Sequence, residues 1–212
     1  MVEDTNSKVS HFKENLMRTS DEGLAHIKKW EGLRTKAYQD VAGIWTIGYG
    51  HTSAAGGLKV TPGLVISEKQ AEEVLRGDLA KFEKRVNSLV KVPISQNQFD
   101  TLVSFDFNTG ALGSSTLLKK LNAGQYDAVP SELMKWVNAG GKKVQGLVNR
   151  RTDEVHLWKK NVENPYLPKE YKDKLSQLPK DEPPKDHVPV TPEPKKSFWV
   201  RLLEIILEAL KK

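Results

Sequence analysis

The sequence predicts an α+β fold that is mostly helical, with one small antiparallel sheet near its N-terminal side. Two observations support this prediction. Through most of residues 18–162, apolar side chains recur every three or four positions, which is the period of an amphipathic helix. Residues 35–50 instead contain the strand formers isoleucine, tryptophan and tyrosine around a turn at Val41-Ala42-Gly43. The sheet therefore follows the first helix, and helices make up the rest of the domain.

The helices are predicted largely from their N-terminal caps. Ser20 precedes an apolar stripe that includes Ile27 and ends near Gly32, so the first helix is placed there. The pattern S-x-x-Q, at Ser67 and again at Ser95, matches a capping box ahead of two further apolar stripes. Three more helices are predicted at 115–122, 131–138 and 146–160.

Four segments follow one another along the chain. Residues 1–17 form an N-terminal extension, and residues 18–162 form the folded domain. Residues 163–196 hold eight of the eleven prolines among charged residues, which predicts an extended linker. Residues 197–212 predict an amphipathic C-terminal helix, shorter than the roughly 20 residues that span a bilayer. Three roles stay open for this helix: membrane-surface contact, self-association, or packing on the domain.

Composition and motifs exclude several classes of protein. The net charge of +6 favours an anionic partner, but charge alone does not choose among nucleic acid, a cell-wall polymer and a membrane surface. The chain has no cysteine, and it contains no HExxH, G-x-S-x-G or complete G-x-G-x-x-G motif. No metal or other cofactor is therefore predicted. The N-terminal residues lack the apolar segment of a signal peptide, so synthesis in the cytoplasm is expected.

Two carboxylates are candidates for acid catalysis. Glu31 lies four residues after Ile27, on the same side of the first predicted helix, and next to Trp30. Apolar surroundings raise the pKa of a carboxyl toward that of a general acid; the alternative is an exposed glutamate at a helix end. Asp40 begins the turn in a more polar setting, although aspartate also commonly begins turns for structural reasons. Glycoside hydrolysis uses two carboxylates in such unlike environments.

Thr46 and His51 are further candidates on and beside a predicted strand. Strand alternation puts Thr46 on one face with Ile44 and Gly48. If that face lines a cleft, the hydroxyl can orient a water molecule and Gly48 leaves room for a ligand; the alternative is an ordinary strand threonine. His51 follows directly and is a candidate third titrating group, although a structural hydrogen bond is favoured for it.

The combination E-x8-D-x5-T, formed by Glu31, Asp40 and Thr46 and followed by IGYGHT, strongly resembles the phage-type lysozymes, endolysins of glycoside hydrolase family 24. Three later stretches resemble the same family in the same order: FNTGALGSSTLLKKLNAG at 107–124, KWVNAGGKK at 135–143 and GLVNRRTDEVHLW at 146–158. The resemblance covers roughly residues 18–160.

This resemblance implies a two-lobed muramidase fold whose cleft holds the glycan of bacterial peptidoglycan, with no nucleic-acid partner. Glu31 would protonate the glycosidic oxygen between N-acetylmuramic acid and N-acetylglucosamine. Asp40 and Thr46 would hold the attacking water or stabilise the transition state.

The resemblance also implies residues that bind substrate. Asn108 and Gly110 lie in the family's helix-to-loop segment and would lie near the cleft. Gly48 and His51, which follow the catalytic threonine, would join them as substrate-binding residues.

Two functional hypotheses follow. The leading one is a phage or prophage endolysin that is made in the host cytoplasm and acts on the cell wall after the membrane is permeabilised. The alternative is a catalytically weak muramidase-fold binding or scaffolding module, placed at a membrane or in an oligomer by its C-terminal helix. Arg150 and Arg151 either face the cleft or pair with Glu154 inside the last helix, and the structural pairing is favoured.

Overall fold

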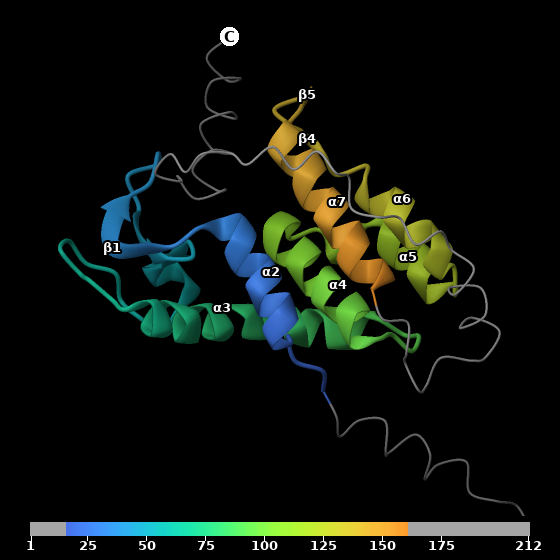
Figure 1. Ribbon diagram of the computed structural model, residues 1–212, viewed down its shortest axis with the longest axis horizontal. Coiled ribbons are helices and arrows are strands. Elements are labelled where there is room, and N and C mark those ends of the chain that lie inside the picture. The colour runs from blue at the N-terminus through green and yellow to red at the C-terminus, as the bar shows by residue number, and fades with distance from the viewer. Residues whose placement is uncertain (1–15, 161–212) are drawn as a thin grey trace, which may run out of the picture.

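The computed structural model describes residues 16–160, and Figure 1 shows how their elements are arranged. Helix α3 (Glu68–Leu89) runs along one side of the domain, with the sheet at one of its ends and the other helices at the other end. The predicted α+β fold class is confirmed. The predicted linker 163–196, the predicted helix 197–212 and nearly all of the extension 1–17 lie outside the described residues.

Helix α2 (Asp21–Glu31) begins and ends where the sequence predicts. The Ser20 hydroxyl accepts a hydrogen bond of 3.0 Å from the Gly23 amide, and Gly32 caps the other end. The buried face of α2 includes Ile27 and ends at Glu31, and the helix packs on α4 (Gln96–Thr109). The last side chain of α2 is therefore directed into the protein.

Three short strands form the sheet in the order β1 (Arg34–Gln39), β2 (Trp45–Gly48) and β3 (His51–Thr52). Both pairings are antiparallel, and Tyr38 of β1 lies opposite Thr46 of β2. The chain reverses at residues 41–43, as predicted. Residues 64–66 return to the free edge of β1 and exchange backbone hydrogen bonds of 2.8 and 2.9 Å with it. β1 is thus hydrogen-bonded on both edges.

The remaining helices build the larger part of the domain around α4. The capping boxes predicted at Ser67 and Ser95 both form, at the starts of α3 and α4. Eleven of the fourteen residues of α4 are buried, and α2, α3 and α7 all pack on it, so α4 is the central helix. Within residues 16–160, no helix is both long enough and apolar enough to cross a bilayer. The other helical elements are α5 (Thr116–Asn122), α6 (Val129–Leu133), α7 (Gln145–Lys159) and the 3-10 turns η1 (Ser53–Ala55), η2 (Leu112–Ser114) and η3 (Tyr126–Ala128).

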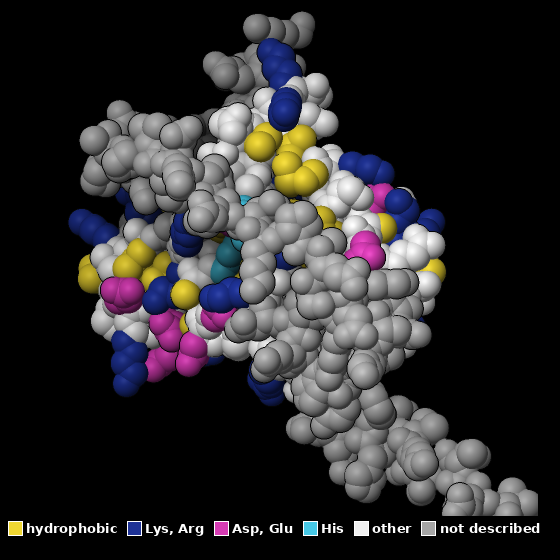
Figure 2. Space-filling model, turned by 45° about the vertical axis from the view of Figure 1, so that its right-hand side comes forward, with side chains coloured by type: hydrophobic (Ala, Val, Ile, Leu, Met, Phe, Trp, Pro, Cys, Tyr) yellow, Lys and Arg dark blue, Asp and Glu magenta, His cyan; other side chains and the backbone are white. Residues whose placement is uncertain are grey.

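One predicted helix is wrong in its second half. The sequence predicts a helix over 131–138, but α6 ends at Leu133 and a hairpin follows, with strands β4 (Asn138–Ala139) and β5 (Lys142–Lys143). Gly140 and Gly141 have φ of +55° and +75°, and two consecutive positive values are what a two-residue hairpin turn requires. This turn overrides the helical pattern before it. The dark blue basic side chains at the top of Figure 2 lie over this hairpin.

Candidate active site

Glu31, the predicted acid, is the last residue of α2 and is completely buried. Its Oε1 accepts a hydrogen bond of 2.7 Å from Nη1 of Arg150 on α7, although 119 positions separate the two residues in sequence. Burial raises the pKa of the Glu31 carboxyl because its charged form loses hydration, and the positive charge of Arg150 opposes that increase. Glu31 is therefore not an exposed glutamate at a helix end.

This contact belongs to a group of four fully buried side chains. We call the group the ion cluster, and its members are Glu31, Arg150, Arg151 and Glu154. Oε1 of Glu154 accepts from Nη2 of Arg151 at 2.8 Å and from Nε of Arg150 at 3.4 Å. The pairing predicted within the last helix is confirmed. The cluster brings two arginines and two carboxyls together, so each buried guanidinium has a carboxyl beside it.

Helix α4 supplies neutral polar groups to the ion cluster. The Ser104 hydroxyl donates to Oε1 of Glu154 at 2.8 Å, and Asn108, one turn later, accepts from Nη2 of Arg151 at 2.9 Å through its Oδ1. Asn108 is 4 % exposed, and its Nδ2 has no hydrogen-bond partner in the described part of the chain. Buried N–H groups are rarely left unpaired, so this amide is a candidate donor to a bound substrate.

Asp40 and Thr46 lie together at the end of the β1–β2 hairpin. Oδ1 of Asp40 accepts hydrogen bonds of 2.9 Å from the amides of Ala42 and Ile44, so the aspartate holds the turn, as its structural interpretation expects. The carbonyl of Ile44 accepts both the Thr46 hydroxyl, at 3.1 Å, and the Asp40 amide, at 3.0 Å. This shared acceptor fixes the backbone of Asp40 relative to the Thr46 hydroxyl.

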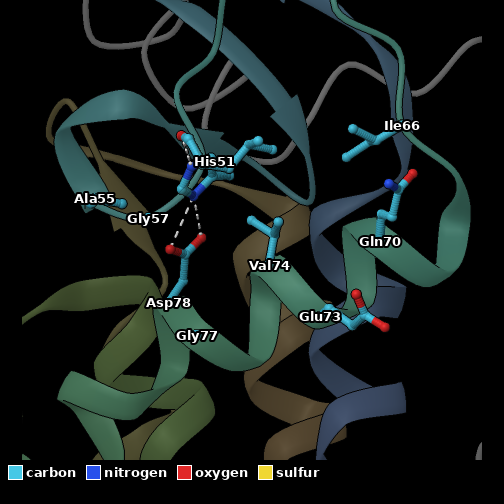
Figure 3. Close-up of a pocket in the computed structure, with 11 residues that line it drawn as sticks. His51, Ala55, Gly57, Ile66, Gln70, Glu73, Val74, Gly77 and Asp78 are labelled. Atoms are coloured by element: carbon cyan, nitrogen blue, oxygen red, sulfur yellow. Dashed lines mark hydrogen bonds and ion pairs between the residues drawn. The ribbon is translucent and has the colours of Figure 1, made fainter.

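Gly48 and His51 face α3. Gly48 has a φ of +64°, which explains the glycine, whereas a Cβ there would make an ordinary contact with Ala71 at 3.4 Å. Nδ1 of His51 lies 2.9 Å from Oδ2 of Asp78, and Nε2 lies 2.8 Å from the Leu58 carbonyl. Figure 3 shows the ring directed at Asp78, beside a pocket of about 470 Å³. Because both ring nitrogens are engaged, the structural hydrogen bond favoured for His51 is confirmed.

Gly110 ends α4 in the left-handed conformation, with φ of +64°. Its carbonyl accepts a hydrogen bond of 2.9 Å from Nη2 of Arg85. A helix C-cap of this kind requires a residue that tolerates positive φ. Gly110 therefore has a structural reason to be glycine whether or not substrate lies near it.

Comparison with known proteins decides the family. The family model described as phage lysozyme matches residues 28–154, more than half of this chain. The chain belongs to the phage lysozyme family. The resemblance found in the sequence is thereby confirmed.

Individual relatives of this phage lysozyme agree with that assignment. An endolysin of Acyrthosiphon pisum secondary endosymbiont phage 1 is 47% identical over 148 residues, which cover 67% of this chain and 98% of the relative. The endolysin of Salmonella phage P22 is 41% identical over 145 residues, covering 68% of this chain and 99% of the relative. The crystal structure of a mutant of P22 lysozyme matches with a TM-score of 0.62 at 40% identity, covering 67% of this chain and 98% of that chain. The predicted lysozyme-like fold is confirmed.

The predicted site residues of this phage lysozyme fall into separate groups. Glu31 and Asn108 both lie at the ion cluster. Arg150 donates a hydrogen bond to Glu31, and Arg151 donates one to Asn108. Asp40 and Thr46 meet at the hairpin. Within residues 16–160 no hydrogen bond or ion pair joins Glu31 to this second pair, and no group of three or more His, Asp or Glu side chains is placed to hold a metal ion.

Sequence reasoning missed the contact between Arg150 and Glu31. The residues lie at opposite ends of the domain sequence, and no spacing rule relates positions so far apart. One signal was present: two adjacent arginines face a single glutamate, Glu154, in the last predicted helix. If all three are buried, two guanidinium groups share one carboxylate, and a second buried carboxyl nearby is expected as a further hydrogen-bond acceptor.

Proposed function

We propose that Glu31 is the general acid of this endolysin, a muramidase that hydrolyses the β-1,4 bond between N-acetylmuramic acid and N-acetylglucosamine in peptidoglycan. The observation that carries the proposal is the complete burial of the Glu31 carboxyl, which raises its pKa. A glycosidic oxygen must be protonated as it leaves, so the acid has to hold its proton near neutral pH. Burial supplies that property to a glutamate.

Asp40 and Thr46 are proposed to act on the other side of the reaction, at the attacking water or the developing positive charge. One oxygen of Asp40 is committed to the turn, which orients the carboxylate and leaves the second oxygen to interact with substrate or water. The hydrogen of the Thr46 hydroxyl is committed to the Ile44 carbonyl, so the hydroxyl oxygen presents lone pairs that can accept a hydrogen bond from water. Both groups would thereby favour the transition state of glycoside hydrolysis.

Among the four proposed substrate-binding residues, Asn108 has the strongest support. Its Nδ2 is a buried donor with no protein partner in the described residues. By contrast, positive φ explains Gly48 and Gly110, and hydrogen bonds within the protein explain His51. We propose that the Asn108 amide donates to a carbonyl or hydroxyl oxygen of the glycan, and that the other three shape the site indirectly.

The decisive experiment compares wild type, Glu31→Gln and Glu22→Gln on purified peptidoglycan, with released fragments resolved by mass and by reducing-end sugar. Reducing N-acetylmuramic acid ends are expected from wild type, and Glu31→Gln should lower the rate by about 10²–10⁴-fold because the acid is lost. Glu22 is an exposed acid on the same helix and serves as the matched control, with its rate unchanged. Near-normal release by a folded Glu31→Gln enzyme would refute the assignment.

A separate experiment on intact cells tests how the enzyme reaches the cell wall. We propose that the enzyme is made in the host cytoplasm and reaches peptidoglycan once the membrane is permeabilised. Intact cells that express the full chain should then lose wall only after permeabilisation. The alternative hypothesis of a catalytically weak scaffolding module has no support from the comparisons. Membrane contact or self-association through 197–212 remains a prediction.

A further inference from the structure

Arg150 connects the proposed acid to a second buried carboxylate. Its Nη1 lies 2.7 Å from Oε1 of Glu31, and its Nε lies 3.4 Å from Oε1 of Glu154. All three side chains are fully buried, so no water at the surface screens their charges. A proton on either carboxyl therefore changes the electrostatic free energy of the other.

The two carboxyls are not equivalent in their hydrogen bonds. Oε1 of Glu154 accepts from the Ser104 hydroxyl, from Arg151 and from Arg150. Oε1 of Glu31 accepts from Arg150 alone, and Oε2 has no hydrogen-bond partner among residues 16–160 in either carboxyl. Because each donor favours the ionised form of the carboxyl that accepts it, Glu154 is the more strongly stabilised anion.

This asymmetry decides where a shared proton resides. Burial raises the pKa of both carboxyls, so the pair tends to hold one proton rather than none. Glu154 accepts three donors and keeps its negative charge, which leaves the proton on Glu31. Both carboxyls have an open Oε2, so the difference lies in the donors to Oε1, three for Glu154 and one for Glu31.

We propose that Glu154 is a positioning residue for the reaction: its negative charge compensates Arg150 and Arg151 and thereby keeps Glu31 protonated. Without Glu154, Glu31 would be the one carboxylate of the ion cluster left to compensate the two arginines. Glu31 would then ionise and lose its function as an acid. This inference rests on the proposed role of Glu31.

The charged groups around the pair come from two helices. Arg150, Arg151 and Glu154 on α7 act on Glu31, while α4 contributes the neutral Ser104 and Asn108. Beyond the ion cluster, Arg150 and Arg151 act on His26 of α2, and Lys29 of α2 and Asp153 of α7 act on the same imidazole.

The test is the pH profile of kcat/KM for the full-length Glu154→Gln enzyme on purified peptidoglycan. The alkaline limb of this profile reports the pKa of the acid in the free enzyme. Glutamine keeps the size and an acceptor oxygen but removes the negative charge, so the limb should move toward lower pH by about one unit, which is roughly a tenfold loss of activity at a pH above the limb. Activity should return on acidification, which a purely structural defect would not produce.

Ser104→Ala provides a milder variant that tests the same idea in a protein more certain to fold. It removes one of the three donors to Glu154 and weakens that anion without removing it. The alkaline limb should move in the same direction by a smaller amount. Thermal unfolding and circular dichroism of each variant identify any that fail to fold.

The outcomes separate this inference from the proposed function. An unmoved limb in folded Glu154→Gln, with Glu31→Gln inactive, would overturn the role of Glu154 and leave Glu31 as the acid. If Glu154→Gln does not fold, an unmoved limb in Ser104→Ala would overturn it equally. Activity retained in Glu31→Gln would refute the proposed function itself.

Discussion

Helix α2 pairs with α3 near the surface and, through Glu31, with α7 in the interior, and these pairs differ chiefly in burial. Toward α3, Lys28 lies 2.9 Å from Glu72, with 23 % and 35 % of their side chains exposed, and Asp21 lies 2.8 Å from Arg76 near the surface. Toward α7, Glu31 lies 2.7 Å from Arg150, and neither is exposed. The distances are nearly equal, so distance cannot explain any difference in behaviour.

The pKa values of the acids show what burial changes. The hydrogen bond from Lys28 lowers the pKa of Glu72, because that carboxylate keeps most of its hydration. Burial raises the pKa of Glu31 even though its cationic partner is at least as close. An ion pair at the surface therefore keeps an acid ionised, whereas the same pair inside the protein makes a carboxyl that can hold a proton.

The largest effect on stability is expected when the buried side loses its cation. Arg150→Met fills similar space but leaves Glu31 and Glu154 without their shared partner, and breaking a buried pair in this way costs about 3–5 kcal/mol. Urea unfolding at neutral pH measures the free energy. A loss below about 1 kcal/mol would mean that the interior pair behaves like a surface pair, and the comparison would fail.

A second prediction uses pH on the buried side of α2. Burial, with the positive charge of Arg150, lowers the pKa of His26 from 6.5 to about 4. The folded protein therefore disfavours the imidazolium, and the unfolded chain binds more protons between these two values. Stability should fall as pH drops through this window, by up to about 3 kcal/mol for this one group.

The matched variant for this test is His26→Gln, which cannot titrate. Urea unfolding of both proteins at pH 7 and at pH 4 gives the difference that belongs to His26, since all other groups are common to both. Wild type should lose more stability on acidification than the variant. Equal losses would show that the imidazole is hydrated in the folded protein.

The smallest effect is expected on the surface side. Arg76→Met removes a cation whose side chain is 42 % exposed and whose partner Asp21 is 97 % exposed. Such pairs contribute less than about 1 kcal/mol, and added salt screens them. Urea unfolding is measured at low and at high salt. At high salt, this variant and wild type should have nearly the same free energy of unfolding. A loss comparable to that of Arg150→Met would contradict the role given to burial.

Local rules predicted most of the fold. Ser20, Ser67 and Ser95 cap helices as expected, because a cap depends on residues within one turn of each other. The hairpin after α6 was missed because the apolar spacing before it also fits a helix. Gly140 and Gly141 overrule that spacing, and their effect is visible only when the turn is considered with its flanking strands.

The site was predictable only in part for a related reason. The pairing of Arg150 and Arg151 with Glu154 follows from helical spacing, so the sequence indicates it directly. The contact between Arg150 and Glu31 depends on α2 and α7 both packing against α4, which is a property of the whole domain. The residues that resemble the family pointed to Glu31 as the proposed acid, but the structure alone supplied its surroundings.

The long separation between Glu31 and Arg150 also has a consequence for synthesis. A chain that grows at about 5–20 residues per second produces α2 roughly 6–24 s before Arg150 exists to meet it. Until then the carboxylate of Glu31 has no buried partner and remains hydrated. Any truncated product that ends before α7 therefore lacks the buried arginine beside Glu31, and the proposed site forms only when the domain is nearly complete.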